Sequence, residues 1–389
     1  MNQKQHKILI VCGFFPYPPM HGGMVDVWKR IEGIKELGHT IDLVYTAKEK
    51  PLEKDILFAK KYIRMLFEVS RKNRVIDIFS SKPLQVTSRS QFKNISIQKQ
   101  YDFVILEGDY VGEFIKNTSV DYGKLIIRSH NNESIYFKNL SKSTSKIFRK
   151  IYYWLEHIKF RNYTKEIYSK ANTIWFISKE DTSKNRTLYK NKVIHLPPPF
   201  SLNEIKKQNL DTKKVLFVGS LFMDNNIEAI LWYLKNIHNE ILKYEKDYEF
   251  IIAGSLGNKT KEVVKKSFNR YKNIQLYMNC ESLDEIYEQA SIFVNPMLHG
   301  AGVKIKSIQA AINGLPLVST TIGVEGIGLQ PDKDFLLAND RETFTLSVLK
   351  LLKEKNKAQR MVDNAQQFLR DHHYIKLLKQ ELNADTKNI

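Results

Sequence analysis

The segment from Asn295 to Pro316 has the composition of a phosphate-binding loop followed by a helix. An apolar run, SIFV, leads into a loop that contains Gly300 and Gly302, and a helix is predicted to follow it. Amides at the start of a helix carry partial positive charge, and lysine adds a full charge. We therefore predict that these amides, Lys304 and Lys306 bind a diphosphate. Either lysine alone would more simply be a solvated residue of an ordinary helix.

Three other positions could contribute to the same chemistry. Gln309 comes one turn after Lys306, so its amide could bridge ribose hydroxyls. Gly22 and Gly23 come directly before a helix predicted over residues 24–37 and could bring backbone amides close to a phosphate. A tight turn that needs positive φ explains the two glycines equally well.

A polar cluster, HNNE, directly follows an apolar strand predicted over residues 124–127. His130 in this cluster could donate a hydrogen bond to a sugar hydroxyl or to developing charge. The alternative is purely structural: Asn132 caps a helix and Glu133 lies in its first turn.

Short apolar runs alternate with amphipathic stretches along the whole chain. This alternation predicts βαβ units and parallel sheets that are covered on both faces. The predicted strands are residues 7–12, 41–45, 102–106, 124–127, 173–177, 214–218, 249–253, 274–278, 291–294 and 315–319.

The proline-rich stretch Leu196–Phe200 divides the pattern into two similar halves. We predict an α/β protein with two Rossmann-like, doubly wound domains facing across a cleft. The N-terminal domain covers residues 1–200, a linker 201–212 and the C-terminal domain 213–360. A helix over 361–389 could cross back to the N-terminal domain. Ligands of such sheets bind outside the carboxyl ends of the strands.

Positive charge is concentrated in the first half of the 389-residue chain. Residues 1–210 carry 37 basic and 20 acidic side chains, whereas residues 211–389 carry 24 and 22. The first half is therefore expected to face an anionic partner. The two cysteines, Cys12 and Cys280, form neither a disulfide framework nor a zinc motif, which indicates a reducing compartment. We expect no signal peptide and no spanning helix, and hence a cytoplasmic protein.

The order and spacing of these motifs resemble the group 1 (family 4) retaining glycosyltransferases of the GT-B fold over essentially the whole chain. The resemblance is carried by Pro16–Gly23, Leu37-Gly38-His39, His130–Glu133, Phe217–Ser220 with Asn226 and Ala229, Asn295–Thr320 and Gly323–Gly326.

This resemblance implies a nucleotide-sugar donor on the C-terminal domain and a glycan or lipid-linked saccharide acceptor on the N-terminal domain. It implies transfer with retention, in the synthesis of a bacterial surface polysaccharide. Gly23 matches the position near the donor diphosphate, His130 the histidine near the transferred sugar, and Lys306 the phosphate-binding lysine. We expect His130 and Lys306 to be catalytic. The expected donor-binding residues are Gly22, Gly23, Ser220, Asn226, His299, Gly300, Gly302, Lys304 and Gln309.

Two departures from the family pattern affect the donor site. Gln309 stands where the second of two paired glutamates usually does, and His299 lies in the region of the first. The Arg and Lys that many members carry after the first C-domain strand are absent, with Leu221–Asn226 in their place. Phosphate neutralisation therefore falls on Lys304, Lys306 and the helix amides.

No Asp-x-Asp motif lies in a suitable loop, so we expect neither a metal ion nor a cofactor, with lysine and helix amides stabilising the leaving diphosphate. Glu107 and Asp109 are weaker candidates for a base. Residues 137–165 contain eight Lys/Arg, several aromatic residues and a single acid, Glu156. Such a segment fits an anionic membrane surface, peripheral at the inner face of the cell membrane, although core packing would also explain its aromatic residues.

Two other functions are compatible with the sequence. A nucleotide-sugar epimerase of GT-B shape would use carboxylates near the donor and need no acceptor. The basic first half could bind nucleic acid, but no recognition motif is present and we expect no such partner. A Rossmann dehydrogenase is disfavoured because no G-x-G-x-x-G follows the first strand.

Overall fold

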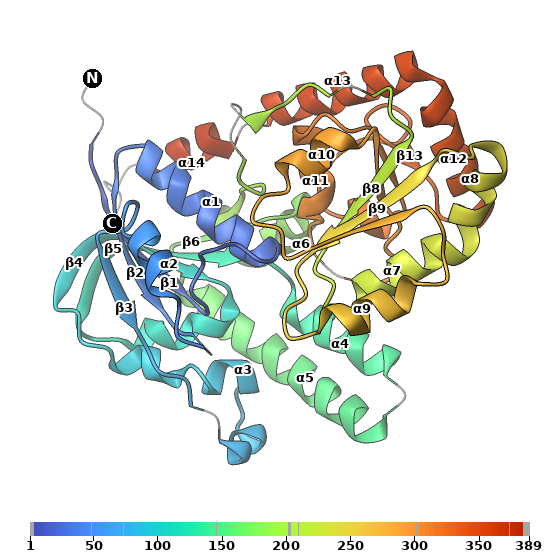
Figure 1. The fold of residues 1–389 in the computed structure, drawn as a ribbon. Helices are drawn as coiled ribbons and strands as arrows, with labels where there is room; N and C mark the ends of the chain where they lie inside the picture. Colours follow the sequence, from blue (N-terminus) through green and yellow to red (C-terminus); the bar gives the residue numbers. More distant parts are fainter. Residues whose placement is uncertain are drawn as a thin grey trace. The chain divides into compact units, whose positions relative to one another are not determined.

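The computed structural model describes residues 4–47, 49–72, 74–144, 146–200, 204–208, 210–300, 302–372 and 374–383. The chain forms two compact units (Figure 1), and it passes from the first to the second between Pro199 and Phe200. The C-terminal helix α14 (Tyr374–Asn383) belongs to the first unit, whereas residues 20–22 group with the second.

The first unit is built on a parallel seven-stranded sheet in the order β3-β2-β1-β4-β5-β6-β7. From β1 the sheet extends through β2 and β3 on one side and through β4 to β7 on the other, as in a doubly wound sheet. The strands are β1 (Lys7–Cys12), β2 (Thr40–Tyr45), β3 (Met65–Glu68), β4 (Lys99–Glu107), β5 (Val120–Ser129), β6 (Thr173–Phe176) and β7 (Val193–His195).

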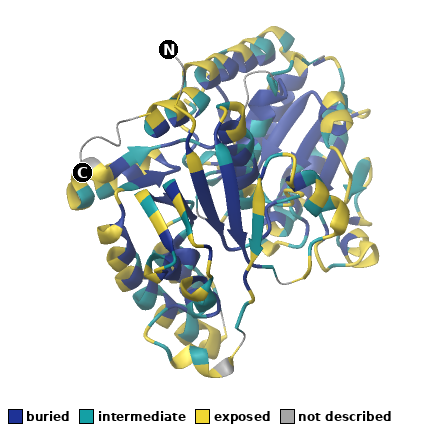
Figure 2. Cartoon of the chain, turned by 90° about the vertical axis from the view of Figure 1, so that its left-hand side faces the viewer, coloured by how far each residue is buried: buried dark blue, intermediate teal, exposed yellow. Residues whose placement is uncertain are grey.

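Alternate residues of these strands supply two separate cores, one on each face of the sheet. Leu9 and Val11 pack on one face, and Ile8 and Ile10 on the other. The central strands are accordingly apolar along their length and buried, while the helices keep exposed outer faces (Figure 2). Burial on both faces explains why the sequence reads as continuous apolar runs there.

The helices of the first unit are α1 (Gly22–Glu36), α2 (Glu53–Ala59), α3 (Leu84–Thr87), α4 (Glu133–Ser143), α5 (Ile147–Lys170), α6 (Lys179–Tyr189) and α14, with 3₁₀ segments η1 (Val75–Phe79), η2 (Ser90–Asn94), η3 (Asp109–Lys116) and η4 (Lys190–Lys192). Gly38, with φ of 82°, ends α1 in a Schellman turn in which His39 N–H donates to the Ile34 carbonyl. Helix α14 packs its Tyr374, Leu378 and Leu382 into the core that α1 also covers.

The second unit contains a parallel six-stranded sheet in the order β10-β9-β8-β11-β12-β13. Its strands are β8 (Lys214–Val218), β9 (Glu249–Gly254), β10 (Ile274–Met278), β11 (Ile292–Asn295), β12 (Leu317–Ser319) and β13 (Leu336–Leu337). Its helices are α7 (Asp224–Tyr233), α8 (Asn239–Tyr244), α9 (Lys261–Phe268), α10 (Asp284–Gln289), α11 (Ile305–Ile312), α12 (Arg341–Lys353) and α13 (Lys355–Asp371), with a π turn (Leu234–His238) and the 3₁₀ segment η7 (Ile322–Val324).

The predicted α/β fold and all ten predicted strands are confirmed, and two helix starts are corrected. Gly22 and Gly23 form the first turn of α1 and are not a loop before it. Helix α11 begins at Ile305, and Lys304 is its N-cap. Strands β3, β7 and β13 were not predicted. None of the described helices combines the length and apolar composition needed to span a bilayer.

Two glycines set the distance between β8 and β9 at their carboxyl ends. A Cβ on Gly254 would lie 1.9 Å from the Gly219 carbonyl oxygen, which is backbone and cannot rotate away. Gly219 N–H also donates to the Ala253 carbonyl at 2.9 Å. Only glycine at position 254 therefore allows the loop that contains Ser220 to lie where it does.

We predict that Gly254→Ala lowers the free energy of unfolding by at least about 2 kcal/mol, because the two strands must separate to admit the methyl group. Urea denaturation followed by circular dichroism measures this. Lys266→Ala, at an exposed position of α9, should change stability by less than about 0.5 kcal/mol. Equal stability of Gly254→Ala and wild type would contradict the close approach.

Candidate active site

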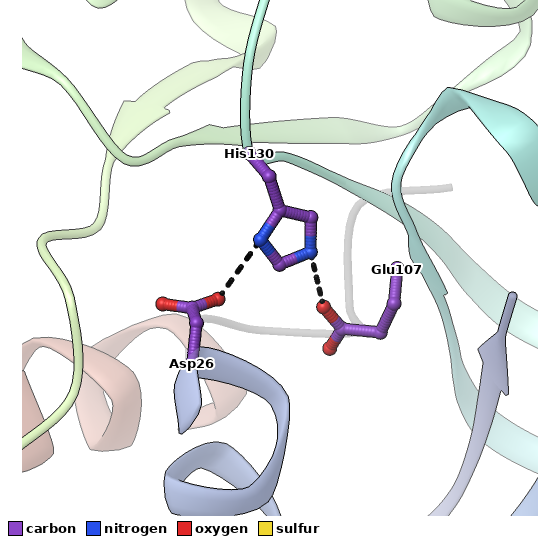
Figure 3. A group of neighbouring side chains, drawn as sticks. All are labelled: Asp26, Glu107 and His130. Atoms are coloured by element: carbon purple, nitrogen blue, oxygen red, sulfur yellow. Dashed lines mark hydrogen bonds and ion pairs between the residues drawn. The ribbon is translucent and has the colours of Figure 1, made fainter. Parts of the chain in front are cut away.

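Two carboxylates and a histidine converge at the carboxyl edge of the first sheet (Figure 3). Asp26 comes from α1, Glu107 is the last residue of β4, and His130 directly follows β5. The His130 ring lies between the two acids. Its Nε2 is 3.0 Å from Glu107 Oε2, and its Nδ1 is 3.3 Å from Asp26 Oδ2. Both ring nitrogens thus face carboxylates, which fixes the orientation of the imidazole.

Two arginines bind the same carboxylates from the other side. Arg30 Nε donates to Glu107 Oε1 at 2.6 Å, its Nη2 donates to Glu107 Oε2 at 3.1 Å, and Nη2 also contacts Asp26. Arg128 Nη2 and Nε donate to the two oxygens of Asp26 at 2.9 and 3.2 Å. The side chains of all four charged residues are fully buried, whereas His130 is 19% exposed. Of these five residues, His130 is therefore the one that can contact a ligand.

Strand register and helix periodicity bring these residues together. Cys12, Glu107 and Arg128 lie side by side in β1, β4 and β5. Asp26 and Arg30 are one turn apart on α1, so both project toward the same sheet edge. Arg30 Nη1 additionally donates to the hydroxyl of Tyr374 at 3.1 Å, which connects α14 to the cluster.

The arginines keep both acids ionised. Burial alone would raise the pKa of Asp26, but Arg128 and Arg30 together lower it well below its ordinary value. Burial likewise opposes ionisation of Glu107, and Arg30 and His130 outweigh it, so that its pKa is also lowered. The result is a charge-balanced network of two carboxylates and two guanidinium groups around the histidine.

Asp26, Glu107 and His130 also offer ligand atoms within 4.8 Å of one another, a spacing that could hold a metal ion. The chemistry of the site favours the arginines instead. Their two positive charges already neutralise both carboxylates and would repel a divalent cation. The donor set therefore fits a metal ion poorly.

A second pair of buried acids lies beside this cluster. Asp109 accepts hydrogen bonds from Thr164 Oγ1 at 2.5 Å and from the Tyr168 hydroxyl at 3.1 Å, and burial raises its pKa to about 6. Glu133 accepts one from the Tyr110 hydroxyl at 2.5 Å, and burial raises its pKa to about 7. Asp109 thus fastens α5 to the sheet edge.

In the second unit, Lys306 is enclosed at the carboxyl edge of the sheet. Its Nζ donates to Asn226 Oδ1 at 2.7 Å and lies 4.4 Å from the centre of the Phe217 ring. Among the described residues, no carboxylate forms an ion pair with it. Burial first, and the charge of Lys304 second, lower the pKa of Lys306 to about 7. This side chain is a cation site without a counterion from the described chain.

Lys304, in contrast, pairs with an acid of its own unit. Its Nζ is 3.0 Å from Glu325 Oε2 and donates to the Gly302 carbonyl at 2.5 Å. The ammonium group is thus neutralised within the protein, and it holds the glycine loop against the Gly-x-Glu-Gly segment. Glu325, 21 residues along the chain, pairs with Lys304, whereas no described carboxylate pairs with Lys306; that both lysines bind one diphosphate stays a prediction.

The other predicted donor residues lie in different parts of the structure. Asn226 Nδ2 donates to the Ser220 carbonyl at 2.9 Å, so these two residues form one unit with Lys306. Gly300 and Gly302 adopt φ of 137° and 82°, which favours glycine. Gln309 is half-buried one turn along α11, and His299 is exposed on the loop. Gly22, Gly23 and His130 belong to α1 and to the end of β5 in the structure.

Sequence reasoning did not identify the partners of the two catalytic candidates. Asp26, Arg30 and Arg128 were not singled out, nor was Glu325 as the partner of Lys304. The one available signal was charge within apolar stretches: Arg128 directly follows the apolar residues Leu125–Ile127 of its strand, and Asp26 and Arg30 share the buried face of α1.

Comparison with known proteins is consistent with this geometry. Residues 212–354, which include Lys306 and Asn226, match the family described as Glycosyl transferases group 1. A Klebsiella pneumoniae protein, described as an uncharacterized 44.6 kDa protein in the cps region, is 34% identical over 376 residues, which cover 94% of this chain and 96% of that protein.

Solved glycosyltransferase structures share the fold at low sequence identity. A TarM variant from S. aureus, in complex with UDP, superposes with a TM-score of 0.72 at 10% identity and covers 99% of this chain and 100% of that one. Sucrose-phosphate synthase from Thermosynechococcus elongatus gives 0.71 at 13% identity, covering 98% of each chain. WaaG, described as a glycosyltransferase of lipopolysaccharide biosynthesis, gives 0.66 at 12% identity, with 97% of this chain and 100% of that one covered.

These matches confirm the resemblance found in the sequence. The chain belongs to the group 1 glycosyltransferases and is a glycosyltransferase with the GT-B fold.

Proposed function

We propose that this glycosyltransferase moves a sugar from a nucleotide diphosphate donor to a glycan or lipid-linked saccharide, with retention and without a metal ion, in the assembly of a bacterial surface polysaccharide. The observation that carries the proposal is Lys306, a half-buried ammonium group that no described carboxylate neutralises. The cps-region relative supports the polysaccharide context. Retention rests on the family resemblance.

A nucleotide diphosphate suits the surroundings of Lys306. Departure of the sugar leaves additional negative charge on the diphosphate, and a preplaced cation stabilises that transition state more than the ground state. Lys306 follows the first residue of α11, so the ammonium group and the amides at the start of this helix are close in the chain. Lysine then supplies the positive charge that a metal ion gives in other transferases. Structural neighbours in complex with UDP or UDP-glucose favour a uridine nucleotide.

His130 is proposed to contact the transferred sugar. Because Glu107 and Asp26 face its two nitrogens, the ring is held in one orientation, with its exposed edge toward the solvent side of the cluster. Asp26 Oδ2 is the more distant partner at 3.3 Å, and a sugar hydroxyl can replace that contact without disturbing the Arg128 pair. The arginine network positions the histidine, and the histidine contacts substrate.

Membrane contact is proposed for α4, the first half of α5 and η1. Phe148, Ile151 and Trp154 on α5 are 85%, 51% and 53% exposed, whereas Phe160 and Tyr163 farther along the same helix are buried. The predicted basic segment therefore divides into an exposed half with apolar side chains and a half that packs into the core.

The 3₁₀ segment η1 extends this apolar surface, which the sequence did not indicate. Its Phe79 is 87% exposed, and Lys159 of α5 donates to the Ile78 carbonyl at 2.7 Å, which fixes η1 beside α5. The exposed basic residues of the segment lie on α4 and around the start of α5, whereas Glu156 and Glu133 are buried; these basic residues are Lys138, Lys142, Lys146, Arg149 and Lys150. Apolar side chains among lysines and arginines match an anionic bilayer at the inner face of the cell membrane.

The first prediction about this function concerns Lys306. In the free protein its pKa is about 7, and a bound diphosphate favours the charged form and raises that pKa. Binding must therefore take up a proton above about pH 7, so donor affinity should be full below that pH and should fall as the pH rises further. The measurement is isothermal titration calorimetry with the nucleotide sugar that gives the largest thermal shift in a panel.

Two variants test the assignment. Lys306→Ala should weaken donor binding about 10- to 100-fold. Lys306→Arg keeps a positive charge at every pH and should bind the donor without the decline above neutral pH. An equal decline in wild type and Lys306→Arg, or unchanged affinity in Lys306→Ala, would contradict the proposal.

The second prediction concerns His130. His130→Ala should slow sugar transfer on the order of 100-fold, because a contact made to the reacting sugar is lost. Donor affinity should stay close to that of wild type, since Lys306 is unchanged. Asn131→Ala, at the neighbouring loop position, is the control and should transfer sugar normally. Full activity of His130→Ala would exclude the proposed contact.

The third prediction concerns the membrane. The protein should co-float with vesicles of phosphatidylcholine and phosphatidylglycerol, and less with phosphatidylcholine alone. Phe148→Ser with Trp154→Ser should reduce binding at least about tenfold, since each ring contributes roughly 1.5–3 kcal/mol when buried in the bilayer. Leu188→Ser removes an equally exposed apolar residue, 67% exposed, from α6 and should leave binding unchanged. Equal loss in both variants would refute a specific surface.

A further inference from the structure

Two arginines, Arg71 and Arg89, lie at the carboxyl edge of the first sheet without an acidic partner. Arg71 follows β3, and Arg89 lies between α3 and η2. Among the described residues, neither guanidinium group forms an ion pair with a carboxylate. This distinguishes them from Arg30 and Arg128, each of which binds a buried acid.

Arg89 is buried, at 7% exposure, and is held by neutral oxygens alone. Its Nη1 donates to the carbonyl and to the side-chain Oε1 of Gln85, both at 2.8 Å. Its Nε and Nη2 reach the Gly13 carbonyl at 3.3 Å, and the ring of Tyr110 lies 5.3 Å away. Carbonyl groups orient this charge but do not neutralise it.

Arg71 brings a second positive charge to the same place. Its Nη2 is 3.4 Å from Gln85 Oε1, the atom that Arg89 also contacts, and 3.3 Å from Ser88 Oγ. Its Nε is buried and has no hydrogen-bond partner. Two like charges thus share a single amide oxygen. Since like charges repel in a partly buried setting, the arrangement is favourable only when an anion lies between or beside them.

The position of this pair relative to His130 follows from the sheet. Gly13 directly follows β1, and Cys12 pairs with Glu107 of β4, the residue that contacts His130 Nε2. Tyr110, beside Arg89, is three residues after Glu107. The arginines and the histidine therefore lie along the same edge of one sheet, where ligands of parallel sheets bind.

We propose that Arg71 and Arg89 form a phosphate-binding site for the acceptor, an inference that rests on the proposed transferase function of His130. A guanidinium group presents a planar pair of N–H donors that matches two phosphate oxygens, and two such groups match the charge of a diphosphate. Arg71 provides the unpartnered Nε and the more accessible edge, and Arg89 the fixed, buried charge. The phosphate belongs either to a lipid diphosphate that carries the acceptor saccharide or to a phosphate substituent of the glycan.

The test uses the full chain with Lys306→Ala, so that the donor site does not bind the probe. Calorimetric titrations with inorganic pyrophosphate and with farnesyl diphosphate should both show binding. Arg71→Gln should weaken it about 10- to 100-fold. Arg74→Gln removes one charge from an exposed position three residues away, and it should bind both probes as tightly as the parent.

Binding of diphosphate probes tests the arginine site, and binding of nucleotide sugars tests the transferase function. Farnesyl diphosphate binding more tightly than pyrophosphate identifies a lipid-linked acceptor, and equal binding identifies a phosphate on the glycan. Unchanged pyrophosphate binding in Arg71→Gln, or equal loss in Arg74→Gln, overturns the site. Nucleotide-sugar binding by Arg71→Gln with Lys306 intact should match wild type. If no nucleotide sugar binds wild type, the transferase proposal fails whether or not the arginines bind pyrophosphate. Arg89→Gln is a weaker test, because Arg89 is buried and its loss could also destabilise the fold.

Discussion

The buried pairing of two arginines with two carboxylates is the constraint on which the first unit depends. Asp26, Glu107, Arg30 and Arg128 come from α1, β4 and β5, and each is fully buried. Charges taken out of water are tolerated only when they are matched, and removal of one partner typically costs about 3–5 kcal/mol because another charge is left unpaired. Those three elements, together with α14 through Tyr374, must therefore keep their relative positions. The same network holds His130, so the stability of this unit and the position of the histidine have one physical origin.

The other charged side chains at the two sheet edges divide into two classes, those that pair with an opposite charge and those that do not. Lys304 is paired with Glu325 and acts on the shape of the glycine loop. Lys306, Arg71 and Arg89 form no ion pair with a carboxylate among the described residues and contact neutral groups instead. A cation that is paired with a carboxylate of the chain can hold an element in position. A cation without a counterion is instead stabilised when an anionic ligand binds beside it. Proximity in sequence does not separate the classes, since Lys304 and Lys306 are only two residues apart.

Much of the fold could be predicted because central parallel strands are apolar on both faces, as KILIVC and KVLFV are. Strands β3, β7 and β13 could not, because they are short and carry no such pattern. His130 and Lys306 could be chosen as candidates because each follows a strand, in a loop or at the start of a helix. Their neighbours were not, because Arg128 reads as an ordinary strand residue until β4 and α1 pack against it. The pairing of Lys304 with Glu325 likewise depends on a tertiary contact that the spacing of the two residues does not encode.

The glutamine at position 309 is consistent with this distribution of charge. With Lys304 neutralised by Glu325, Lys306 is the free ammonium group of the described loop and helix. A carboxylate one turn along α11 would oppose its attraction for a diphosphate, whereas an amide keeps the ability to hydrogen-bond ribose hydroxyls and adds no charge. In a chain that also lacks the cations after the first strand of this unit, a neutral side chain at position 309 leaves the positive potential around Lys306 undiminished.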